Sequence, residues 1–191
     1  MPASQGMSSW SIFIYIMFLL INCILANWKM NLTKLVVNAS PIISLAQIGY
    51  ADLLLNLSSE LVIPKGVFEE ITAYSIEDPA VLWMREKKKS LVHQVEIPTI
   101  ISEWNLGKGE SEVIAFSYQQ KEYVVAIDDR AAKRCAESFD IKVRGTIALI
   151  IDAKRKRFIS EATPLLLKLK GNGFRISAAV FDEALKLAGE S

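Results

Sequence analysis

Hydrophobic residues along the chain occur in two arrangements, short continuous apolar runs and longer stretches with helical spacing. Short runs rich in β-branched side chains are typical of buried strands, whereas apolar residues at every third or fourth position indicate amphipathic helices. The apolar runs predict strands at residues 34–38, 61–63, 91–97, 123–127 and 141–143.

Helical spacing and helix-end signals occupy the stretches between these runs. Ser40 suits an N-cap and Pro41 a first helical turn, so the first helix should run from Pro41 towards Ile48, with Gly49 ending it. The other helices are predicted at residues 51–57, 64–74, 78 to the basic run 85–89, 109–120, 130–139, 146–156, 160–170 and 177–188.

The alternation of strands and helices determines the expected fold class. Strands joined by helices through short connections form a parallel sheet that is covered on both faces. The chain has 191 residues, 51% of them hydrophobic and 23% charged, which fits one globular domain with a buried core. We therefore expect an α/β fold with a central parallel sheet.

The first thirty residues differ from the rest, because residues 10–28 carry no charge. As a helix they would span about 28 Å, close to the hydrocarbon thickness of a bilayer. One interpretation is a membrane anchor, with Lys29 and Lys34 favouring a cytoplasmic domain. The other is an over-extended gene start, with Met30 beginning a cytoplasmic protein. A secretory signal fits less well, since a basic n-region is missing. The expected division is an apolar segment 1–29 and a domain 30–191.

Charge and cysteine content narrow the function classes. The formal net charge is +1, so any nucleic-acid binding must come from local basic patches. Cys23 and Cys135 form neither a disulfide framework nor a zinc motif. The only histidine, His93, lies in an alternating run and is expected on the solvent face of a strand.

Acidic residues recur at the ends of the apolar runs, as Glu69-Glu70, Glu110 with Glu112, and Asp128-Asp129, while Asn38 occupies a fourth such position. Because the carboxyl ends of parallel strands meet at one crevice, these side chains should converge there. Several carboxylates in one place repel one another unless a hard cation such as Mg²⁺ lies among them. The pattern predicts a metal-dependent hydrolase with one ligand altered.

Helix geometry predicts which acids face inward. At about 100° per residue, Glu70 falls on the edge of an apolar face while Glu69 points away. By the same rule Glu110 should face the sheet and Glu112 the solvent. The alternative for Glu110 is an acid in the first helical turn that stabilises the helix dipole.

Six segments carry a family resemblance, and together they cover nearly all of the chain after Met30. From residue 35 onward the chain resembles a PIN-domain protein, in the branch similar to VapC-type toxins. The matching stretches are residues 36–43, 63–71, 106–112, 127–132, 143–146 and 173–177. The resemblance implies a three-layer α/β/α sandwich and Mg²⁺- or Mn²⁺-dependent cleavage of RNA.

The resemblance also assigns roles to residues. The acidic cluster of the family maps onto Asn38, Glu70, Glu110 and Asp129, with Asp128 as a further candidate metal ligand. Glu70, Glu110 and Asp129 are the candidate catalytic residues, and Asn38, Glu110, Asp128 and Asp129 the candidate metal ligands. The candidate substrate contacts are Ser40, Arg130, Lys133, Arg134 and Thr146.

Asn38 is the departure from the family pattern, because an amide offers a neutral oxygen but no charge to hold Mg²⁺. Two functions follow. One is a metal-dependent ribonuclease, the toxin of a pair with a small antitoxin protein. The other is a nucleic-acid- or protein-binding module whose metal site Asn38 has weakened. Members of the family commonly form homodimers, so a second copy of the chain is another expected partner.

Overall fold

The structure, a computed structural model, describes residues 32–87 and 91–190. Residues Thr33–Ser191 form one compact unit. The apolar segment 10–28 and the alternative start at Met30 lie outside the described residues. In the part of the chain that is described, no helix is both long and apolar enough to span a bilayer.

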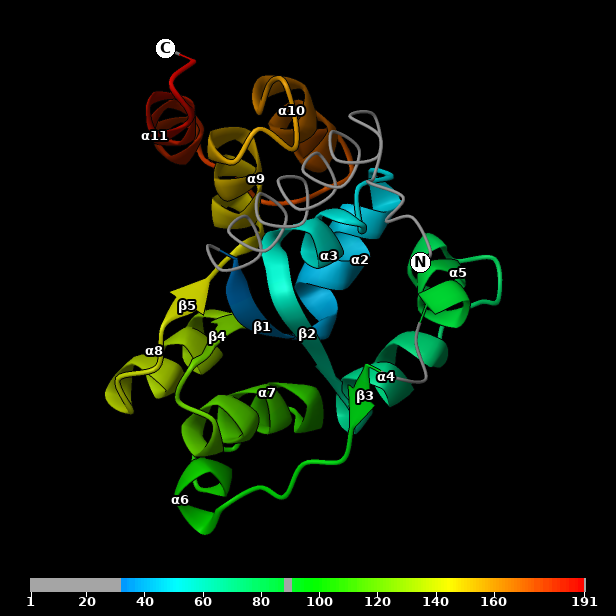
Figure 1. Cartoon of the computed structure of the whole chain (residues 1–191), viewed down its shortest axis with the longest axis vertical. Coiled ribbons are helices and arrows are strands. Elements are labelled where there is room, and N and C mark those ends of the chain that lie inside the picture. Colours follow the sequence, from blue (N-terminus) through cyan, green and yellow to red (C-terminus); the bar gives the residue numbers. More distant parts are fainter. Residues whose placement is uncertain (1–31, 88–90, 191) are drawn as a thin grey trace, which may run out of the picture. The chain divides into compact units, whose positions relative to one another are not determined.

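Five strands form a single parallel sheet in the order β3-β2-β1-β4-β5 (Figure 1). Strand β1 is the central strand and pairs in parallel with both β2 and β4. The strands are β1 (Thr33–Val37), β2 (Ser58–Pro64), β3 (Val92–His93), β4 (Tyr123–Ala126) and β5 (Val143–Arg144). The prediction of an α/β sandwich with a central parallel sheet is confirmed.

Helices cover both faces of this sheet. The helices are α2 (Ala39–Gln47), α3 (Leu53–Leu57), α4 (Lys65–Thr72), α5 (Pro79–Lys87), α6 (Thr99–Ser102), α7 (Lys108–Gln119), α8 (Arg130–Ser138), α9 (Thr146–Arg155), α10 (Thr163–Gly171) and α11 (Ala178–Ala188). The β1 to β2 and β4 to β5 connections run in opposite directions along the sheet, so right-handed crossovers place α2 and α3 on one face and α8 on the other. Helix α9 packs against α2 and α3, and α7 packs against α8.

The core lies between these layers and is formed by the predicted apolar runs. Val36, Val37, Ile63 and Val125 are completely buried, as expected for strands covered on both faces. His93 is exposed at the edge strand and lies edge-on to the ring of Phe116, so its expected place on a solvent face is confirmed.

Two predicted elements differ from the structure. The first helix begins at Ala39, with Asn38 and not Ser40 as its N-cap residue. Pro41 still fits, because the first-turn N–H groups of a helix have no partner within it. The strand predicted at 91–97 is reduced to β3, which pairs only with Ile63 and Pro64. Since β2 ends at Pro64, the chain beyond His93 has no strand to pair with.

Gly49, just after α2, provides a test of the local backbone. Its φ is +80° and a Cβ there would meet nothing within 4 Å, so Gly49→Ala adds backbone strain without a clash. We expect it to lower the free energy of unfolding by about 1 kcal/mol. Gly171→Ala, in α10 and equally uncrowded, is the control and should be neutral or stabilising. Urea unfolding measures both, and equal effects would contradict the assigned backbone conformation.

Candidate active site at the carboxyl ends of the strands

Asn38 lies directly after β1, where the strands end. Its backbone N–H donates to the carbonyl of Ala126 at 3.0 Å, which fixes it beside the end of β4. The residue is 5% exposed, and Oδ1 has no hydrogen-bond partner among the described residues. Leaving a buried acceptor unpaired costs about 1–3 kcal/mol, so such an atom calls for an explanation. The side-chain Oδ1 of Asn38 is therefore an oxygen that is available to bind a ligand, at the position where the sequence predicted a metal ligand.

Ser40, two residues after Asn38, also carries a buried side-chain oxygen. Its Oγ is the other buried side-chain atom that lacks a hydrogen-bond partner within residues 32–87 and 91–190. Its expected N-cap role is wrong, because α2 begins at Ala39. Its role as a substrate contact stays a prediction.

Glu70 reaches the same place from α4. A Cβ atom on Gly109 would lie 3.2 Å from Asn38 Oδ1 and 3.0 Å from Glu70 Oε2. Both oxygens therefore lie beside the first turn of α7, on the side of Gly109 where a side chain would be. Gly109 leaves the space between them open, because any larger residue there would press on both.

Glu110 lies in that first turn of α7. Its Oε2 accepts a hydrogen bond from the backbone N–H of Gly107 at 3.0 Å, a capping arrangement that agrees with the alternative of an acid in the first helical turn. Burial away from water raises the pKa of Glu70, and the nearby charge of Glu110 raises it further. Glu70 and Glu110 are thus neighbours whose negative charges oppose each other.

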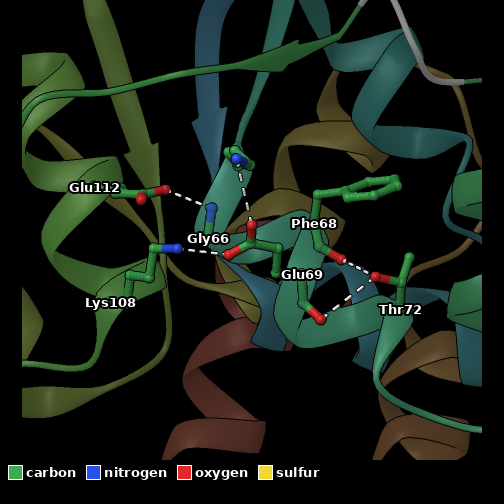
Figure 2. Close-up of polar contacts among 7 residues, drawn as sticks. Gly66, Phe68, Glu69, Thr72, Lys108 and Glu112 are labelled. Carbon is green, nitrogen blue, oxygen red and sulfur yellow. Dashed lines mark hydrogen bonds and ion pairs between the residues drawn. The ribbon is translucent and has the colours of Figure 1, made fainter.

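The prediction for Glu112 is wrong. It was expected to face solvent, but it is 2% exposed and its Oε2 accepts from the backbone N–H of Gly66 at 2.6 Å (Figure 2). Helix α7 packs against α4 as well as against the sheet, so its buried surface is wider than one stripe. A signal for this contact was Gly66, since a Cβ there would lie 2.8 Å from Glu112 Oε2.

Glu69 is exposed, as predicted, and its carboxylate forms ion pairs with Lys108 of α7 and Lys65 of α4. The hydrogen bond from Lys108 holds the pKa of Glu69 below its ordinary value. Figure 2 shows Lys108 and Glu112 reaching from α7 to neighbouring residues of α4. Two acids thus join α4 to α7, one buried and one in solvent.

Asp128 and Thr146 form a second group, at the ends of β4 and β5. The backbone N–H and the hydroxyl of Thr146 donate to the two carboxylate oxygens of Asp128, at 2.9 and 2.6 Å. Thr146 is completely buried. It was expected to donate to substrate, but in this structure it positions Asp128 and begins α9.

Asp129 is exposed and caps α8, since its Oδ1 accepts from the N–H of Ala132 at 2.9 Å. In the described ranges, no three acidic, cysteine or histidine side chains lie close enough together to hold a metal ion. The expected convergence of Asp129 with Glu70 and Glu110 as a trio of acids is therefore not found. What the structure brings together at the first turn of α7 is the amide of Asn38 and the carboxylate of Glu70, and Glu110, the residue after Gly109, is close enough for its charge to act on Glu70.

Basic residues lie beside the second group. Arg130 and Lys133 of α8 line a pocket of about 610 Å³ together with Asp128, Gly145, Ile147, Phe174 and Arg175. Arg134 is exposed and does not line this pocket. Sequence reasoning identified Arg130 and Lys133 but assigned no role to Phe174 or Arg175.

The sequence profile of a family described as a PIN domain matches residues 34–190, which include every described strand and helix after residue 33. The chain belongs to the PIN-domain family. Searches of curated proteins and of solved structures found no match. The PIN domain is a nuclease-type fold whose members generally use divalent metal ions. The VapC-type branch is not resolved by this match.

The residues of this PIN domain fit a divalent cation with oxygen ligands. Asn38 supplies a buried carbonyl oxygen without a donor, and Glu70 and Glu110 supply neighbouring carboxylates. A cation would satisfy the first and relieve the repulsion between the other two. The set carries one negative charge fewer than an all-carboxylate set would.

The buried contact and the exposed ion pair between α4 and α7 predict that two alanine variants differ strongly in stability. Glu112→Ala leaves the Gly66 N–H unpaired in the interior and should lower the free energy of unfolding by about 2–3 kcal/mol. Glu69→Ala removes only exposed ion pairs and should cost under about 1 kcal/mol. Urea unfolding of the two variants measures this. Equal losses would contradict the buried contact.

Because the pKa of Glu70 is raised, we predict that Glu70→Gln becomes more stable than the wild type as the pH rises. Well below the ordinary value of 4.5 this carboxyl is protonated in folded and unfolded chains alike, so metal-free variant and wild type should be equally stable. As pH rises to 7, the wild type must ionise a partly desolvated carboxyl that feels the charge of Glu110. The variant should then be more stable, by under about 1 kcal/mol after solvent screening. Thermal unfolding in EDTA at pH 3.5 and 7 measures this.

The control for this experiment is Glu77→Gln, which removes an exposed acid on the α4–α5 connection. It should change stability little at either pH. If the stability of Glu70→Gln relative to the wild type is the same at pH 3.5 and pH 7, Glu70 and Glu110 are not coupled in solution.

Proposed function

We propose that this PIN domain is a ribonuclease that depends on Mg²⁺ or Mn²⁺, with Asn38, Glu70 and Glu110 as the residues that hold the ion. The observation that carries the proposal is the unpaired Oδ1 of Asn38, buried beside two carboxylates that oppose each other.

Such an ion, when bound, orients a phosphate, lowers the pKa of water and offsets developing negative charge. Asn38 contributes a neutral oxygen whose position is fixed by the backbone bond to Ala126. Glu110 has one oxygen engaged with the Gly107 N–H, which restrains its orientation. Among the described residues Glu70 makes no such bond to a backbone N–H, and its raised pKa makes it the better proton acceptor of the two.

Asp128 and Asp129 complete the acidic edge in this proposal. The two bonds from Thr146 hold Asp128 in place, and Asp129 is exposed at the start of α8. Asp129 keeps one oxygen on the Ala132 N–H, so its other oxygen is the one that can act as a ligand or as a water-mediated ligand. Arg130, Lys133 and Arg134 lie next along the chain and would bind phosphates of the RNA without regard to sequence.

The second candidate function is a nucleic-acid- or protein-binding module without catalysis. The observations that favour it are the neutral side chain at Asn38 and the structural hydrogen bonds of Asp128 and Asp129. Under either function the proposed location is the cytoplasm, and under the ribonuclease function the ligand is RNA. The toxin role, a small antitoxin partner and a homodimer extend the ribonuclease proposal.

Cleavage of a labelled RNA by the purified protein separates the two functions. We expect cleavage that needs Mg²⁺ or Mn²⁺ and falls at least about 10 to 100-fold in Glu110→Gln, which loses a charged ion-holding group, and in Asp129→Asn, which loses the charge proposed to act at the acidic edge through water. Both variants keep an oxygen for the hydrogen bond at the helix start, so the fold should be retained.

Asp140→Asn is the matched control for Asp129→Asn. Asp140 is an exposed aspartate just beyond the other end of α8, with a positive φ that asparagine also tolerates. It should leave cleavage unchanged. RNA that is bound but never cut by the wild type, with either ion, would favour the binding module. Cleavage that survives in Glu110→Gln would remove the proposed ion-holding residues from the reaction.

A further inference from the structure

The pocket beside Asp128 has a composition suited to a nucleotide. Its volume of about 610 Å³ lies in the range of about 300–1,000 Å³ that is typical of small-ligand sites. Three cationic side chains and one aromatic ring line it, from two segments that are far apart in the sequence. They are Arg130 and Lys133 from α8, and Phe174 and Arg175 from the connection between α10 and α11.

The three cations of the pocket are available to a ligand. Across the described ranges, ion pairs engage lysines and arginines elsewhere, such as Lys34 and Lys108, but none is formed by Arg130, Lys133 or Arg175. The one acid in the lining, Asp128, already accepts two hydrogen bonds from Thr146, which partly compensate its charge. The balance of the pocket therefore favours an anion such as phosphate.

The backbone around Phe174 holds the ring at the pocket. Gly173 has a φ of +88° at the end of α10, and the N–H of Phe174 donates back to the carbonyl of Leu169 at 3.0 Å. Phe174 is half-buried and packs against the core on one side, while it lines the pocket on the other. An aromatic ring with an accessible surface beside cations is the arrangement on which nucleobases stack in single-stranded complexes.

We infer that this pocket binds one nucleotide of the RNA substrate, with the base against Phe174 and the adjoining phosphates on Arg130, Lys133 and Arg175. The inference rests on the proposed function, because it takes RNA as the ligand. The pocket shares Asp128 with the acidic edge and lies at the ends of β4 and β5, whereas Asn38 lies beside the end of β4 on its other side. An RNA strand would cross the ends of the strands from the pocket to the acids.

Binding of two fluorescein-labelled probes to the full-length protein tests this, with EDTA present so that no strand is cut. One probe is an eight-nucleotide oligouridylate, and the other an abasic strand with the same number of phosphates. Phe174→Leu should weaken oligouridylate binding about tenfold, the loss expected for one stacked base, and leave the abasic strand unaffected. Fluorescence anisotropy measures both, and circular dichroism checks the fold.

Arg175→Gln tests the phosphate contact separately, and it is safe for folding because Arg175 is exposed. It should weaken both probes and reduce the slope of log affinity against log salt by about 0.7. Lys170→Gln is the matched control, because Lys170 is an exposed cation on α10 outside the pocket lining. It makes the same charge change and should alter binding less than about twofold.

The inference is overturned if Phe174→Leu binds oligouridylate as the wild type does, if Arg175→Gln behaves like Lys170→Gln, or if the wild type binds neither probe. Cleavage of the same oligouridylate with Mn²⁺ distinguishes this failure from failure of the proposed function. A wild type that cuts RNA while the pocket variants bind normally refutes the pocket alone. A wild type that never cuts RNA but shows the expected binding pattern refutes the ribonuclease alone.

Discussion

Parallel pairing of β1 with both β2 and β4 determines where Asn38, Glu70, Asp128 and Asp129 lie, because these residues follow the three strands. Because the three strands run in one direction, the residues that follow them emerge at one edge of the sheet. The backbone bond from Asn38 to Ala126 extends the pairing by one residue beyond β1 and brings the amide beside the end of β4. Strand order brings Glu70, Asp128 and Asp129 to this edge, whereas Glu110 reaches it from the first turn of α7.

A second constraint sets the spacing within that edge. Helix α4 follows β2 and helix α7 comes before β4, and the two pack against each other (Figure 1). Gly66 and Gly109 allow this close approach, since a side chain on either would press on a carboxylate of the other helix. The buried bond from Gly66 to Glu112 then holds Glu70 over the first turn of α7. A structural acid and two candidate functional acids thus occupy neighbouring turns.

The sequence predicted the sheet, most helices and the place of Asn38, because continuous apolar runs and glycine or proline signals are local features. It also separated Glu70, whose Oε2 lies beside Gly109, from Glu69, which pairs with Lys108 and Lys65, although both acids are exposed. It failed for Glu112, which faces a second helix that no local pattern reveals. It could not show that Asp129 caps α8, because an N-cap and a metal ligand need the same residue type. It did not identify Phe174 and Arg175, because only tertiary packing brings them next to α8 at the pocket.

The central claim is that Asn38, Glu70 and Glu110 form a site for a divalent ion, and calorimetric titration of the metal-free protein with Mn²⁺ tests it most directly. The account predicts saturable binding that is abolished by Glu70→Gln and tightened by Asn38→Asp, because the latter adds a charged ligand at an oxygen already in place. Absence of binding in the wild type, or binding that neither substitution changes, would contradict the account.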